Sequence, residues 1–73
     1  MNIRKGMWVT HADGVAIVAN TDAVAAEIHF VDSAGLTIGQ KIVPVGDLKQ
    51  ARLADIPAPR RPAKAHGEKF GYR

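Results

Sequence analysis

Residues 36–48 read LTIGQKIVPVGDL, and this stretch decides the fold that the sequence predicts. Its first part predicts a strand over about residues 36–43. A glycine inside a strand often marks a bulge, so we expect strong curvature near Gly39. Pro44 has no N–H for a ladder hydrogen bond, so the strand should end there. Residues 45–48 then predict one turn of 3-10 helix.

Three short strands precede this stretch and one follows it. Apolar segments predict strands over about residues 6–11, 15–20 and 25–31, and a last strand over about residues 50–53. The Asp-Gly pair at 13–14 predicts a tight turn, because this pair tolerates positive φ. Five short strands with one helical turn before the fifth predict an all-β fold, a small closed or partly open barrel.

Alternation of side chains assigns the core. We expect Met7 and Val9 to point inward, which places Trp8 on the outer face together with Thr10. The full predicted core is Met7, Val9, Val15, Ile17, Ile28, Phe30, Leu36, Ile38, Ile42, Leu48 and Leu53.

Composition limits the class of protein. The chain has 73 residues and no cysteine, which excludes disulfides, thiolate chemistry and Cys-ligated metal sites. No apolar run approaches the roughly 18 residues of a membrane span, and no signal peptide is visible. We therefore expect a cytoplasmic protein with no membrane partner, built as one barrel domain over residues 1–56 and a tail over residues 57–73.

The positive charge lies mostly in the tail. Residues 57–73 hold five basic residues against one acidic residue, whereas residues 1–56 hold five against six. Three prolines close together favour an extended, polyproline-like stretch, and residues 63–72 favour a short helix that begins after Pro62. We expect a flexible or partly helical tail that is able to bind phosphates.

Residues 5–55 resemble the SH3-like barrel superfamily. The resemblance rests on KGMWV at 5–9, DGVAIV at 13–18 and VPVGDL at 43–48. The first two segments are similar to the glycine–strand–turn–glycine–strand opening of such barrels, and the third to their penultimate strand with its 3-10 turn. These motifs are structural, so the resemblance implies a five-stranded SH3-like barrel rather than an activity.

One enzyme family shares this fold. Plasmid type II dihydrofolate reductases are SH3-like barrels that form tetramers around a central pore, and QKIVPV at 40–45 lies where that family carries Val-Gln-Ile-Tyr before Pro-Val. Val43 takes the tyrosine position and Lys41 separates Gln40 from Ile42. This departure removes the residues that would bind folate and nicotinamide, so the likeness implies a shared fold without shared catalysis. The whole chain also resembles small bacterial or prophage-type proteins of unassigned role.

No catalytic or metal-binding constellation is visible. The histidines His11, His29 and His66 have no ligand spacing such as HxH or HExxH. The aspartates fall in predicted turns, where a carboxylate accepts local backbone hydrogen bonds. Ser33 has no adjacent base. We expect a non-catalytic protein without a cofactor or a metal.

Basic and aromatic residues are the candidate binding residues: Arg4, Lys5, Trp8, Arg60, Arg61, Lys64, Lys69 and Arg73. An outward Trp8 near Arg4 and Lys5 could stack on a nucleobase or grip a proline of a peptide. The alternative is that Trp8 packs under the chain's own proline-rich tail or caps an end of the barrel. Three functions follow: a nucleic-acid-binding module, which we favour, a protein–protein adaptor or assembly factor, and a small oligomeric enzyme of the reductase type.

Overall fold

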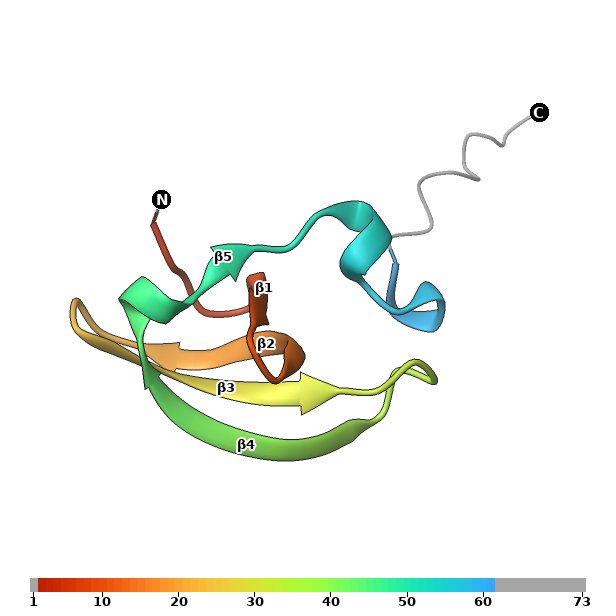
Figure 1. Cartoon of the computed structure of the whole chain (residues 1–73), viewed down its shortest axis with the longest axis horizontal. Helices are drawn as coiled ribbons and strands as arrows, with labels where there is room; N and C mark the ends of the chain where they lie inside the picture. The colour runs from red at the N-terminus through yellow and green to blue at the C-terminus, as the bar shows by residue number, and fades with distance from the viewer. Residues whose placement is uncertain (1, 62–73) are drawn as a thin grey trace.

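The computed structural model describes residues 2–61, which form one five-stranded antiparallel sheet (Figure 1). The strands are β1 (Trp8–His11), β2 (Gly14–Thr21), β3 (Ala25–Val31), β4 (Thr37–Pro44) and β5 (Lys49–Gln50), in the order β4-β3-β2-β1-β5. Three 3-10 turns accompany them, η1 (Val45–Asp47), η2 (Leu53–Asp55) and η3 (Ala58–Arg60). The all-β prediction is confirmed. Among these residues no helix has the length and apolar character needed to cross a membrane.

Most of the predicted elements lie where the sequence places them. β3 and η1 match, because polar turn residues flank β3 and Pro44 precedes η1. The fifth strand was predicted over residues 50–53 and is wrong in extent, since β5 covers Lys49–Gln50 and Leu53 already begins η2. β5 is short because it pairs with β1 at two positions only.

Two register shifts curve the sheet. Phe30 faces Gly39, but its neighbour Val31 faces Thr37, so Ile38 has no partner on β3. This irregularity confirms the bulge expected near Gly39, and a bulged strand bends more strongly than a regular one. A second shift leaves Ala19 of β2 unmatched. Figure 1 shows the result, with β4 sweeping in an arc below β3 and β5 lying beyond β1.

The core lies on the concave face of this sheet. Its buried residues are Val9, Ala16, Val18, Ala26, Ile28, Val43 and Leu48, with Ile3, Met7, Phe30 and Val45 packed against them. Val9, Ile28 and Leu48 were predicted correctly, and Met7 and Phe30 were predicted to be in the core and are partly buried.

Six of the predicted core residues are not in the core. Val15 and Ile17 are only half-buried, because β2 turns its smaller residues, Ala16 and Val18, inward. Leu36, Ile38, Ile42 and Leu53 are 52–73% exposed. On β4 the buried side chain is that of Val43, which lies opposite the buried Ala26 of β3.

Residues 51–61 return to the sheet after β5. The N–H of Ala51 donates to the carbonyl of Trp8 at 3.1 Å, which continues the β1–β5 pairing. Further on, Ile56 is buried and Arg60 donates from Nη1 to the carbonyl of Gly35 at 2.7 Å. The first residues of the predicted tail, 57–61, therefore pack against the turn between β3 and β4. The helix expected over 63–72 lies outside the described residues.

Candidate functional site

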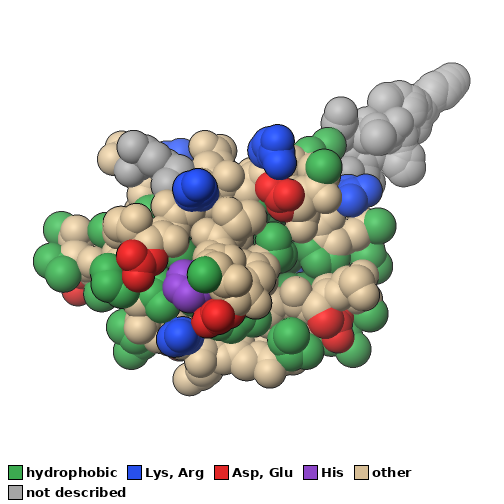
Figure 2. Space-filling model, in the orientation of Figure 1, with side chains coloured by type: hydrophobic (Ala, Val, Ile, Leu, Met, Phe, Trp, Pro, Cys, Tyr) green, Lys and Arg blue, Asp and Glu red, His purple; other side chains and the backbone are tan. Residues whose placement is uncertain are grey.

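Positive charge gathers on one side of the domain. Six of the seven Lys and Arg side chains among residues 2–61 belong to two segments, residues 4–5 and 49–61. We call four of them, Arg4, Lys5, Lys49 and Arg52, the basic edge; all four are exposed. Figure 2 shows most of the visible Lys and Arg side chains along the upper side, over β5 and the chain that follows it, and one of them lower down, where most acidic side chains lie.

Strand pairing brings the two basic segments together. β5 lies beside β1, where Thr10 faces Lys49 and Val9 faces Gln50. Arg4 and Lys5 belong to a turn just before β1, closed by the bond from the N–H of Met7 to the carbonyl of Arg4 at 3.0 Å. Arg4, Lys5 and Gln50 line one shallow surface depression with Asn2, Gly6 and Met7. This depression joins the basic N-terminal turn to β5.

Lys49 and Arg52 were not among the candidate residues from the sequence. They are single charges, far in sequence from Arg4 and Lys5, and no local motif marks them. Only the pairing of the last strand with the first places them near the N-terminal turn. Expected antiparallel pairing of the first and fifth strands was the one signal that could have found them.

The remaining described cation lies far from the basic edge. Lys41 stands on β4, at the opposite end of the sheet, and its Nζ lies 3.1 Å from Oδ2 of Asp13. Within residues 2–61, Asp55 is the one acidic group that pairs with the basic edge, with its Oδ2 at 3.6 Å from Nε of Arg52. Arg52 is still 87% exposed, so its charge remains available to a partner.

Trp8 is covered by the chain itself. It lies on the face opposite the buried Val9, as alternation predicts, and it is half-buried. The guanidinium carbon of Arg60 lies 5.5 Å from the centroid of its ring, which is within the range of a cation–π contact. Of the two interpretations of Trp8, packing under the proline-rich segment is therefore the arrangement in this structure.

The candidate cations of the tail divide into three groups. Arg60 contacts Trp8 and Gly35. Arg61 turns away from them and donates from Nε to the carbonyl of Ile56 at 2.8 Å and from Nη2 to that of Ala54 at 3.3 Å. Lys64, Lys69 and Arg73 lie outside the described residues. Part of the hydrogen-bonding capacity of Arg60 and of Arg61 is therefore already used within the chain.

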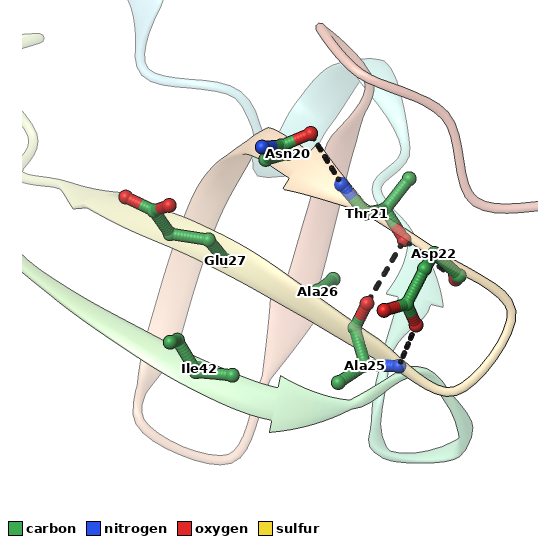
Figure 3. Close-up of a pocket in the computed structure, with 7 residues that line it drawn as sticks. All are labelled: Asn20, Thr21, Asp22, Ala25, Ala26, Glu27 and Ile42. Atoms are coloured by element: carbon green, nitrogen blue, oxygen red, sulfur yellow. Dashed lines mark hydrogen bonds between the residues drawn. The ribbon is translucent and has the colours of Figure 1, made fainter.

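A second depression lies at the turn between β2 and β3, and Asp22 and Glu27 are among the residues that line it (Figure 3). Oδ1 of Asp22 accepts the N–H groups of Val24 at 2.8 Å and Ala25 at 2.9 Å. These bonds, first that from Ala25, lower the pKa of Asp22 below its ordinary value. Glu27 pairs with His29 at 2.9 Å. Both carboxylates line this depression, but each has its own local partner and neither pairs with the other.

His11 and His29 lie apart from each other in the structure and have different partners. Nδ1 of His11 accepts the N–H of Asp13 at 3.1 Å, and its ring meets Phe30 edge to face at 5.9 Å. His29 lies on β3 between Ile17 and Gln40 of the neighbouring strands. No three metal-ligating side chains come together within residues 2–61. His66 lies outside that range.

Comparison of the chain with protein-family models, with curated proteins and with solved structures found no match.

Proposed function

We propose that this chain is a small, non-catalytic SH3-like barrel that binds nucleic acid through the phosphate backbone. The strand order β4-β3-β2-β1-β5, with a 3-10 turn before β5, supports the barrel assignment. The observation that carries the function is the basic edge, where Arg4 and Lys5 lie beside β5 and its flanking cations. The tail, with Lys64, Lys69 and Arg73, follows Arg61 in the sequence and adds positive charge to the chain.

Phosphate contacts suit this surface better than base contacts do. Trp8 has Arg60 over its ring, so it is not free to stack on a base. Exposed Lys and Arg side chains on a strand and a turn neutralise phosphates wherever the backbone passes. Binding of this kind depends little on sequence and falls steeply with salt, because counterions are released from the nucleic acid.

The test is a binding titration of the full chain with a labelled single-stranded DNA of about 20 nucleotides, followed by fluorescence anisotropy at several salt concentrations. We expect the logarithm of the affinity to fall linearly with the logarithm of the salt concentration. In the double variant Lys5→Gln/Lys49→Gln the slope should become shallower by about 1.4, or about 0.7 for each lost phosphate contact.

Lys41→Gln is the matched control. It removes one positive charge, as each substitution of the double variant does, but from the opposite end of the sheet, so it should leave both slope and affinity nearly unchanged. Affinity without salt dependence, or equal losses in both variants, would contradict the proposal. Complete absence of binding at low salt would favour the protein–protein adaptor instead.

A further inference from the structure

We infer that β4 is a self-association edge, which pairs antiparallel with β4 of a second copy of this chain. β4 ends the sheet: β3 covers one of its sides, and none of the described strands covers the other. Seven of its eight residues are exposed. An uncovered strand of this length presents unpaired N–H and C=O groups, which are a template for another strand.

The uncovered strand is also apolar. Ile38 is 65% exposed and Ile42 is 73% exposed, and Leu36, just before the strand, is 64% exposed. Apolar side chains of this size, grouped on one strand rather than scattered, mark an interaction surface. The opposite edge of the sheet differs, since β5 has two residues, both polar.

The charge of β4 does not oppose pairing. Lys41 is the only charged residue of the strand, and it faces the buried Ile28 in the register with β3. It therefore stands on the concave face, where its Nζ meets Asp13 at 3.1 Å. A lysine on an edge usually discourages association, but this one is held within its own domain.

The strand is complementary to itself in one register. When Gln40 faces Gln40 of the second copy, Ile38 faces Ile42 and Lys41 faces Gly39, each twice because of the two-fold axis. Pro44, which lacks an N–H, falls opposite Leu36 and so bounds the paired segment at residues 37–43.

The other registers fit less well, and an axis centred on Gly39 pairs only residues 37–41 of β4. Centring the axis on Lys41 places two ammonium groups opposite each other, and centring it on Ile42 brings Pro44 opposite Gln40 and shortens the paired segment. The two-fold antiparallel register centred on Gln40 thus has both advantages: the longest paired segment and contacts between isoleucines. These matches favour a second copy over an unrelated extended peptide.

Sedimentation velocity of the full chain from about 10 μM to about 1 mM tests the inference, because an interface this small should give a dimer in that range. Ile42→Lys should raise the dimer dissociation constant at least about tenfold. The fold should tolerate this change, since residue 42 is exposed and faces Glu27 on β3. Leu53→Lys, which adds the same charge to another exposed apolar residue outside the sheet, is the matched control and should leave the dimer unchanged.

A cysteine pair tests the register directly, because the natural chain contains no cysteine. Gln40→Cys should form a disulfide-linked dimer under mild oxidation, since directly facing residues of antiparallel strands have suitable Cα separations. Lys49→Cys on β5 is the control and should stay monomeric under the same conditions.

A chain that stays monomeric at every concentration overturns the inference, and the edge is then left to a segment of another protein. A dimer that survives Ile42→Lys, or one in which Gln40→Cys fails to cross-link, would overturn the pairing through β4. Because β4 and the basic edge lie at opposite ends of the sheet, failure here leaves the nucleic-acid titration independent.

Discussion

The guanidinium of Arg60 lies over the ring of Trp8, with 5.5 Å between its central carbon and the ring centroid. The same group donates from Nη1 to the carbonyl of Gly35 at 2.7 Å. One side chain from η3 thereby joins the first strand to the turn between β3 and β4. The proline-containing segment after β5 is held against the sheet by this contact, and the indole is shielded by it.

Arg60→Ala should therefore lower the free energy of unfolding by about 1–2 kcal/mol, from the lost cation–π contact and the lost charge-assisted hydrogen bond. Trp8 is the only tryptophan, so its emission follows urea unfolding directly. The emission of the folded variant should also shift to the red, since the ring gains contact with water.

Arg61→Ala is the matched control for this change. Arg61 bonds to the carbonyls of Ile56 and Ala54 and not to Trp8, so its loss should lower stability without a red shift. If both variants left the emission unchanged, Arg60 would not cover the indole in solution.

Substitution of Gly35 should also destabilise the contact with Arg60. Its φ is +86°, and an added Cβ would lie 3.0 Å from Cγ of Arg60 and 3.4 Å from Cβ of Pro59. Gly35→Ala should cost about 1–3 kcal/mol, from the left-handed backbone and from displacement of Arg60. Urea unfolding measures the loss, and the emission of Trp8 should shift as it does in Arg60→Ala.

Gly39→Ala serves as its control. No atom lies within 4 Å of an added Cβ at Gly39, and its φ is outside the left-handed region. We expect a change within about 0.5 kcal/mol. If Gly39→Ala lowered the free energy of unfolding as much as Gly35→Ala does, the glycine would be required at the bulge and not at the contact with Arg60.

The free energy of unfolding should depend on pH through Asp22. The N–H groups of Ala25 and Val24 stabilise its charged form, so its pKa in the folded chain lies below the ordinary value of 3.8. Its contribution to stability is present above the unfolded-state pKa and is lost as the pH falls through the folded-state pKa. The stability advantage of the natural chain over Asp22→Asn should therefore shrink on acidification below about pH 4. An NMR titration that places the pKa of Asp22 at or above 3.8 would contradict this account.

The number of strands and most of their positions along the chain could be predicted from the sequence, because local signals determine them. Asp13-Gly14 and Pro44 act on their own backbone, and the bulge at Ile38 follows from the neighbouring Gly39. The inward face of β2 could not be predicted in this way. Residues 15–19 are all apolar, so the sequence has no alternation of polar and apolar residues to show which face of β2 is buried.

Of the candidate site, the exposed cations Arg4 and Lys5 could be identified from the sequence, as could the outward position of Trp8. The contact of Arg60 with Trp8 was implied only as packing of a proline-rich segment. No local motif marks Lys49 and Arg52, because their place beside the N-terminal turn depends on pairing between strands far apart in sequence. Tertiary pairing of this kind leaves no local pattern.

Two isoleucines on neighbouring strands test the assignment of the core. The sequence predicts both Ile28 and Ile42 to be buried, whereas Ile28 is fully buried and Ile42 is 73% exposed. Ile28→Ala should lower the free energy of unfolding by about 2–5 kcal/mol, because it leaves a cavity beneath the sheet. Ile42→Ala should change it by less than about 0.5 kcal/mol when measured near 1 μM, where an edge-paired dimer dissociates.

Urea unfolding followed by the emission of Trp8 measures both variants under the same conditions. The two substitutions delete the same atoms from strands of the same sheet, so the difference between them reports burial alone. A large loss at Ile42 at this low concentration would mean that β4 turns its other face inward, and that the apolar edge is part of the core. A small loss at Ile42 beside a large one at Ile28 would leave the isoleucine of β4 free for contact with a second chain.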